Sequence, residues 1–215
     1  QEFIFVSSIA ALDDLNPVTK KLDEKSAFNA SKKHSTYALS KFRAEMEVWR
    51  GSQEGLNVIV VNPSVIIGSL DGKRESERIF RNHFTNRYAP AGGTGFVDVR
   101  DVVNIILQLQ DAKIYNQKFV LNSENALYFD VLDQVAKKYH KSAKKVSTTT
   151  LKVIYKLSQI GKIFGLPYLD KATFEAITTL TEYDHQKIVE TLNYQFIPVK
   201  EAIDYHFDYY NKLKL

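Results

Sequence analysis

The sequence predicts an α/β fold with a parallel sheet, followed by a smaller and mostly helical C-terminal lobe. Short runs of apolar strand formers recur at residues 3–6, 57–61 and 118–121. Stretches with helical periodicity separate these runs, and strands that alternate with helices are typical of a parallel α/β sheet. After about residue 124 only helical patterns remain, which predicts the separate lobe.

The first apolar run, Phe3–Val6, ends at Ser7 and Ser8. A continuous apolar run of this length is typical of a strand that is buried on both faces of a parallel sheet. Such a strand needs neighbours, because its backbone groups would otherwise lack partners. We therefore expect that another segment covers this strand, or that the natural protein has more chain before Gln1.

The other elements follow in order along the chain. A polar loop is expected over 9–34, and then a helix over 35–53 that Ser35 or Thr36 can cap. Further along, we expect turns over 63–68 and 92–95, a strand over 95–99, and helices over 73–88, 100–110, 128–140, 151–164, 170–180, 184–192 and 198–212. The change at residue 124 predicts two domains, 1–123 and 124–215.

Composition excludes several classes of protein and site. The 215 residues include no cysteine, which excludes disulfides and Cys-ligated zinc or iron–sulfur sites. No apolar run approaches the ~18–20 residues of a membrane span, and the chain does not open with a signal peptide. Because 22 of the 29 basic residues are lysine and nucleic-acid readers favour arginine, we expect no nucleic-acid partner. Cytoplasmic localisation is the simplest expectation.

The strongest local motif is YALSK at residues 37–41. Tyr37 and Lys41 are four residues apart and therefore share one face of the expected helix. An ammonium beside a phenol stabilises the phenolate and lowers its pKa from about 10, which suits general acid/base work on an alcohol or carbonyl. Ser8 follows the first strand, at the end where open parallel sheets bind ligands. By itself, the pair is more simply explained as a surface helix pair.

The blocks around this motif resemble the extended short-chain dehydrogenase/reductase family, also called the NAD-dependent epimerase/dehydratase family, in its dihydroflavonol-reductase-like branch. The matching blocks run from Phe3 to about Tyr210: FIFVSSIAAL, YALSKFRAE, VIVVNPSVIIG, GFVDVRDVV, KFVLNSENALYFDVLDQVAKKYHK and LNYQFIPVKEAI. The resemblance implies a Rossmann-like sheet whose first strands are absent from this chain. Residues 1–123 would be the C-terminal part of the nucleotide-binding domain, with interleaved substrate-lobe segments, and 124–215 the substrate-binding lobe.

The resemblance implies a role for each matching residue. Tyr37 would transfer the proton, Lys41 would assist it and hold the nicotinamide ribose, and Ser8 would hold the substrate oxygen. Ser7 is a weaker candidate for the serine. The turn whose backbone would lie against the nicotinamide consists of Pro63, Ser64, Val65 and Ile66.

The implied function is that of an NAD(P)-dependent oxidoreductase, with NADP favoured over NAD, that passes hydride between nicotinamide C4 and a carbonyl or alcohol carbon. Two alternatives stay open: a nucleotide-sugar epimerase or dehydratase that returns the hydride to its substrate, and a non-catalytic member that binds or regulates. The expected partner is a small carbonyl or alcohol substrate. A homodimer also stays open, because relatives often pair through the helix that carries the Tyr and Lys.

The chain departs from the family in one important respect. It contains no GxxGxxG turn, the family's signature of pyrophosphate binding. The glycine cluster at 92–95 precedes a strand-like run and not a long helix, so we expect a loop there. We therefore expect the 215-residue chain to be inactive by itself.

Three remaining features have competing interpretations. The stretch 151–169 is amphipathic at helical spacing, with Lys152, Lys156 and Lys162 beside its apolar residues. We expect it to pack as the lid of the substrate lobe; the alternative is a membrane-surface helix, and we expect no membrane association. His34 either faces the substrate or is solvated, and the acidic residues of VDVRDV (97–102) are expected to be structural.

Overall fold

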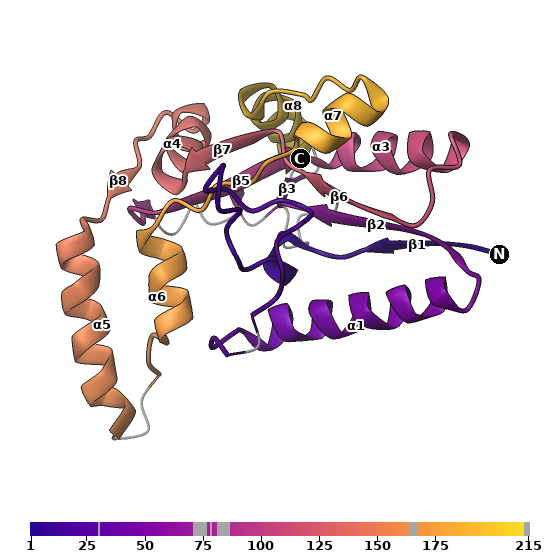
Figure 1. Cartoon of the computed structure of the whole chain (residues 1–215). Coiled ribbons are helices and arrows are strands. Elements are labelled where there is room, and N and C mark those ends of the chain that lie inside the picture. The colour runs from indigo at the N-terminus through magenta and orange to yellow at the C-terminus, as the bar shows by residue number, and fades with distance from the viewer. Residues whose placement is uncertain (30, 71–76, 78, 81–86, 164–166, 213–215) are drawn as a thin grey trace. The chain divides into compact units, whose positions relative to one another are not determined.

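A computed structural model of the chain describes residues 1–29, 31–70, 77, 79–80, 87–163 and 167–212 (Figure 1). The chain forms two compact units, neither of which is continuous in sequence. Unit 1 contains residues 1–67, 95–124 and 182–202, and unit 2 contains residues 68–94, 125–181 and 203–215. The boundary expected at 123/124 lies beside one of these changes. The return of 182–202 to unit 1 has no signal in the sequence.

The elements are as follows. Unit 1 holds β1 (Glu2–Val6), η1 (Ile9–Ala11), α1 (Thr36–Gln53), β2 (Asn57–Pro63), β3 (Val65–Ile67), α3 (Val99–Asp111), β6 (Gln117–Leu121) and α7 (Gln186–Leu192). Unit 2 holds β4 (Tyr88–Ala89), α4 (Tyr128–Lys138), β8 (Lys144–Lys145), α5 (Thr148–Ile163) and α6 (Lys171–Thr178). Three elements begin in one unit and end in the other: β5 (Gly93–Asp98), β7 (Glu124–Leu127) and α8 (Val199–Lys212).

The expected parallel sheet is confirmed. Strands β1, β2 and β6 are all parallel and lie in the order β1-β2-β6, with Val6 opposite Val61 and Val61 opposite Phe119. Helix α1 connects β1 to β2 and α3 precedes β6, as parallel strands require crossover connections. The carboxyl ends of the three strands therefore lie at the same edge of the sheet.

Helices cover both faces of this sheet, with α1 on one side and α3 on the other (Figure 1). Successive side chains of a strand point to opposite faces. Ile59 and Val61 of β2 accordingly pack in one cluster with α3 and α7, and Val58 and Val60 pack in another with Val48 of α1. Burial on both faces explains why β2 is an unbroken apolar run.

The loop before α1 and the helix α7 protect the edge of the sheet at β6. A carboxylate oxygen of Glu24 accepts a hydrogen bond from the Val120 N–H at 2.8 Å, and the Lys187 ammonium donates to the Lys118 carbonyl at 2.9 Å. These two side chains satisfy backbone groups that a further strand would otherwise pair. Burial raises the pKa of the Glu24 carboxyl and lowers the pKa of the Lys187 ammonium.

Several expected elements need correction. The turn expected at 63–68 contains β3, which pairs in parallel with β5 through Val65 and Phe96. The loop expected at 92–95 begins β5 at Gly93. The stretch after residue 124 is not purely helical, because β7 and β8 lie there. The helix expected over 73–88 falls mostly outside the described residues.

The glycines of β5 are required by close packing and not by a turn. A Cβ atom on Gly95 would lie 2.2 Å from the side-chain oxygen of Asn122, and one on Gly93 would lie 2.3 Å from the Ala126 carbonyl oxygen. Any larger residue would force these neighbours apart. Glycine inside a strand often marks such a close approach. None of the described helices is both long and apolar enough to cross a bilayer.

Candidate functional site

The site expected from the sequence lies at the carboxyl end of β1. The Lys41 ammonium on α1 donates a hydrogen bond to the Val6 carbonyl, the last residue of β1, at 2.9 Å. It also lies 5.4 Å from the centre of the Phe5 ring. One of its three N–H donors is used by Val6, so two remain for other oxygens.

Tyr37 lies one helical turn before Lys41, in the first turn of α1. Ser35 caps this helix by accepting from the Ala38 N–H at 3.1 Å, which fixes where the first turn begins. The Tyr37 side chain is 56% exposed, and no described residue holds its hydroxyl. The phenol is therefore presented to solvent on the same helix as Lys41.

The two serines after β1 have different environments. Ser7 is buried, and its hydroxyl donates to the Glu45 carboxylate at 2.7 Å. Ser8 is half-buried and caps η1 by accepting from the Ala10 N–H at 3.2 Å, which leaves its own O–H as a donor. Of the two, Ser8 is the serine whose hydroxyl hydrogen is not already committed to a carboxylate.

Glu45 is the residue of this region that sequence reasoning missed. Its buried carboxylate accepts from Ser7 Oγ at 2.7 Å, from Asn62 Nδ2 at 3.1 Å and from Trp49 Nε1 at 3.4 Å, and lies 3.5 Å from the Lys118 ammonium. One carboxylate thus joins α1 to β2, to β6 and to the residue just after β1. A signal was present, because Glu45 follows Lys41 by four residues on the same face of α1. A helix-borne Glu is usually solvated, which hides that signal.

The turn at the carboxyl end of β2 holds the four residues expected near the nicotinamide. Pro63 and Ser64 are buried, and the Ser64 N–H donates to the Leu121 carbonyl at 2.9 Å. Val65 is exposed and Ile66 is half-buried. The carboxyl ends of β1 and β2 are neighbours in the sheet, so this turn belongs to the same edge as Lys41.

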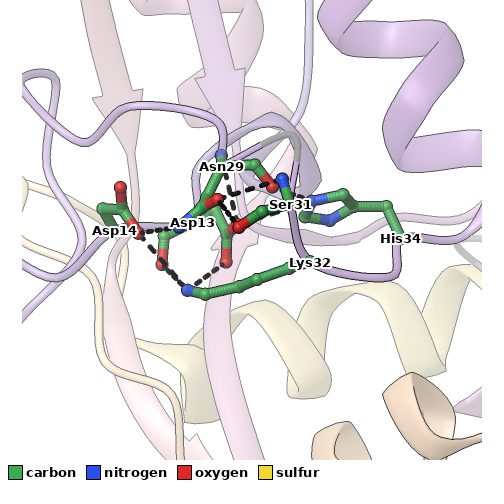
Figure 2. Close-up of polar contacts among 6 residues, drawn as sticks. All are labelled: Asp13, Asp14, Asn29, Ser31, Lys32 and His34. Atoms are coloured by element: carbon green, nitrogen blue, oxygen red, sulfur yellow. Dashed lines mark hydrogen bonds and ion pairs between the residues drawn. The ribbon is translucent and has the colours of Figure 1, made fainter.

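His34 is neither free in solvent nor presented outward. Figure 2 shows it packed within the loop before α1, together with Asp13, Asp14, Asn29, Ser31 and Lys32. Its Nε2 donates to the Asn29 carbonyl at 2.8 Å and lies 3.4 Å from an Asp13 oxygen, and its ring stacks on Phe28 with 4.0 Å between centres. Lys32 joins the same group through Asp13 at 3.0 Å and Asp14 at 3.3 Å. These contacts are structural, since they order the loop that leads into α1.

The acidic residues of the VDVRDV block have structural contacts, as expected. Asp98 caps α3 by accepting from the Arg100 N–H at 2.7 Å and also pairs with the Arg100 guanidinium at 2.7 Å. Asp101 accepts from the Tyr194 hydroxyl at 2.8 Å and from the Ile197 N–H at 3.0 Å. Burial raises the pKa of the Asp101 carboxyl, and burial together with this carboxylate raises the pKa of Tyr194.

Comparison with known proteins finds a matching family model and curated reductases. Residues 1–137 match the family model NAD_binding_4, described as male sterility protein. A putative dihydroflavonol 4-reductase from Synechocystis is 30% identical over 129 residues, which cover 57% of this chain and 37% of that protein. Tetraketide alpha-pyrone reductase 2 from Arabidopsis thaliana is 28% identical over 110 residues, which cover 48% of this chain and 34% of that protein.

Solved structures share the fold along the whole chain. A nucleoside-diphosphate-sugar epimerase from Pseudomonas aeruginosa has a TM-score of 0.78 at 16% identity, over 97% of this chain and 66% of that chain. The chain therefore spans about two-thirds of that structure and a smaller part of the curated relatives. The family match covers more than half of the 215 residues. Together with the Rossmann-like parallel sheet, it shows that the chain belongs to the NAD-binding male sterility protein family, within the short-chain dehydrogenase/reductase proteins.

Proposed function

We propose that the protein containing this chain is an NAD(P)-dependent reductase of a small carbonyl compound, or the corresponding alcohol dehydrogenase. The observation that carries the proposal is the 2.9 Å contact between the Lys41 ammonium and the end of β1. It brings Lys41 to the strand end that Ser8 follows, with the exposed Tyr37 one turn away on the same helix. Reductases among the relatives support the direction of the reaction.

The proposed chemistry uses each residue for one task. The Ser8 O–H donates to the substrate carbonyl oxygen and orients it. As the carbonyl carbon gains a hydride, its oxygen takes the proton from the Tyr37 hydroxyl, and the resulting phenolate is stabilised by the Lys41 ammonium. In the direction of oxidation, the phenolate takes the proton back from the alcohol. The atoms and charges balance in both directions.

The residues present fit the nicotinamide end of the cofactor. An NAD(P) cofactor supplies or accepts the hydride at nicotinamide C4. The two unused N–H groups of Lys41 suit the hydroxyls of a ribose, and the turn at residues 63–66 would lie against the nicotinamide. A structure of Gre2 from Candida albicans in complex with NADPH shares the fold, with a TM-score of 0.68 at 18% identity, over 100% of this chain and 65% of that chain. NADP is accordingly the cofactor we favour.

The test is Tyr37→Phe in the intact protein. Loss of the proton donor is expected to lower kcat about 10²–10⁴-fold, the usual contribution of a general acid. Binding of NADPH, followed by fluorescence, is expected to change little. Tyr209→Phe is the matched control, since Tyr209 is also exposed and lies far along the chain on α8. An unchanged kcat in Tyr37→Phe overturns the assignment.

A second outcome distinguishes the epimerase or dehydratase alternative. This alternative is supported by two structural neighbours, a nucleoside-diphosphate-sugar epimerase and a dTDP-glucose 4,6-dehydratase in complex with NAD. A reductase consumes NAD(P)H stoichiometrically, and absorbance at ~340 nm falls with turnover. Turnover of a nucleotide sugar with no net change in that absorbance would establish the alternative. Binding of the cofactor without turnover of either substrate class would indicate a non-catalytic member.

A further inference from the structure

On one side of helix α5 in unit 2, Leu151 is buried and Tyr155, Ser158 and Gln159 are half-buried, whereas apolar residues on the other side are exposed. Ser158 accepts from the Leu169 N–H at 3.1 Å, and Gln159 donates to the Leu169 carbonyl at 2.6 Å. On the same side, the Tyr155 ring lies 4.6 Å from the Phe174 ring of α6. The two helices lie side by side (Figure 1). These contacts fix the rotation of α5 about its own axis.

The opposite side of α5 carries four exposed apolar side chains at helical spacing. They are 48–62% exposed: Val153, Ile154, Leu157 and Ile160. The sequence led us to expect that this stripe packs inward as a lid, but the structure turns it outward. Rolling the helix to bury the stripe would break both hydrogen bonds to Leu169, and unpaired buried polar groups are costly.

The charges on α5 itself have one sign. Lys152 and Lys156 are exposed beside it, and α5 carries no acidic residue. Over the wider segment 134–169 the sequence has eight lysines and neither Asp nor Glu. An outward apolar stripe beside lysines is the pattern of a helix that lies in the plane of an anionic membrane surface. Another protein would have to supply both an apolar groove and several carboxylates to match the same face.

We propose that α5 docks this protein on the surface of a bilayer containing anionic lipid, with Val153, Ile154, Leu157 and Ile160 in the headgroup boundary. Lys152 and Lys156 pair with lipid phosphates and carboxylates at the rim of the same face. The helix lies on the bilayer and does not cross it. The proposal is independent of the reaction proposed above, because no residue of the Tyr37 region takes part.

The test is co-sedimentation of the protein with vesicles of phosphatidylcholine alone and with about one-third phosphatidylserine. We expect pelleting with the anionic vesicles, little with the neutral ones, and weaker binding as salt rises from 0.1 to 0.5 M because screening grows. Leu157→Asp with Ile160→Asp is expected to abolish binding. Lys152→Glu with Lys156→Glu is expected to lower partitioning at least about 25-fold, at roughly fivefold for each lysine lost.

Matched controls distinguish binding through this face of α5 from nonspecific adsorption to the vesicles. Val103 and Leu107 on α3 are 49% and 52% exposed, so Val103→Asp with Leu107→Asp changes an apolar pair of equal exposure in unit 1. Lys33→Glu with Lys200→Glu changes the charge by the same amount at two other exposed lysines. Both control variants are expected to bind anionic vesicles within about twofold of the unchanged protein if only the α5 contacts matter.

A second measurement covers the case in which an aspartate variant folds poorly. Leu157→Trp keeps the face apolar, and its fluorescence is expected to shift to the blue and to be quenched by brominated lipid on binding. Two results would overturn the proposal. One is no pelleting with anionic vesicles by the folded protein. The other is a dimer in sedimentation velocity without lipid that Leu157→Asp converts to a monomer, since α5 would then pair with a second copy.

Discussion

Glu45 shows how a single residue determines the geometry of the proposed site. Its carboxylate receives three donors and an ammonium, from α1, the residue after β1, β2 and β6. The helix is thereby tied to the sheet about one turn after Lys41 and just over two turns after Tyr37. No residue in contact with Glu45 is itself a proposed proton donor. Glu45 is therefore a positioning residue and not a catalytic one.

We expect Glu45→Ala to lower the free energy of unfolding by about 3–5 kcal/mol, because it leaves the Lys118 ammonium, the buried Ser7 and Asn62 donors and the half-buried Trp49 donor without this acceptor. Glu45→Gln should lower the free energy of unfolding by less, about 1–3 kcal/mol. Its amide oxygen can still accept some of these hydrogen bonds, but its NH₂ group faces a donor. Urea unfolding measures both. The control is Glu47→Ala, an exposed residue of the same helix that pairs only with Arg50, with an expected change below about 0.5 kcal/mol. Equal losses at positions 45 and 47 would contradict this role.

At the scale of elements, the edges of the sheet are treated differently. At the β6 edge, the Glu24 and Lys187 side chains form hydrogen bonds with backbone groups that a further strand would otherwise pair. β1 lies at the other edge of the described sheet, with Phe3 and Val6 exposed. An apolar edge strand without such protection is a ready site for pairing with another strand. That β1 is a central strand covered by a further segment stays a prediction.

Glu24 offers a test of the protected edge that depends on pH. Its folded pKa is raised above 4.5 by burial, so the folded state binds this proton more tightly and stability is lost as pH rises through the folded pKa. Glu24→Gln keeps an acceptor for the Val120 N–H without the charge. We therefore expect its free energy of unfolding, relative to the unchanged protein, to rise between pH 4 and pH 7. Glu24→Ala should instead lose about 1–3 kcal/mol at both pH values, because the N–H is left unpaired. A Gln variant whose relative stability falls with pH would contradict the shift.

At the scale of the whole molecule, the sequence predicted the strands and helices whose apolar residues follow a regular pattern. It did not predict the features that depend on contact between segments far apart in the chain. The buried strands and most of the described helices were predictable, because each is long and its burial pattern is continuous. Strands β7 and β8 have only four and two residues, so they are too short to carry such a pattern. The pairing of Leu22 with Tyr183, which returns 182–202 to unit 1, depends on tertiary contact alone. In the proposed site, spacing predicted that Tyr37 and Lys41 share one face of α1, and Ser8 was predicted from its place after β1, whereas the contacts of Glu45 were hidden by the expectation that charge is solvated.

The whole-molecule consequence concerns cofactor affinity. The chain covers 66% of the epimerase chain from Pseudomonas aeruginosa and contains no GxxGxxG turn. The residues assigned to the cofactor here would touch the nicotinamide and its ribose, but not the pyrophosphate. Each hydrogen bond to a charged group contributes about 1.5–3 kcal/mol, so two missing pyrophosphate contacts correspond to a loss of affinity of at least about 100-fold.

We therefore expect the 215-residue chain by itself to bind NADPH at least about 100-fold more weakly than a longer form of the protein that includes a GxxGxxG turn. Quenching of Trp49, the single tryptophan of the chain, and NADPH fluorescence can both follow the titration. Lys41→Ala serves as the control in the longer protein, where it should weaken binding only by the ribose contacts. Tight binding of NADPH by the 215-residue chain would contradict the proposal that this chain holds only the nicotinamide and its ribose. The pyrophosphate would then have to be held by residues outside any glycine-rich turn.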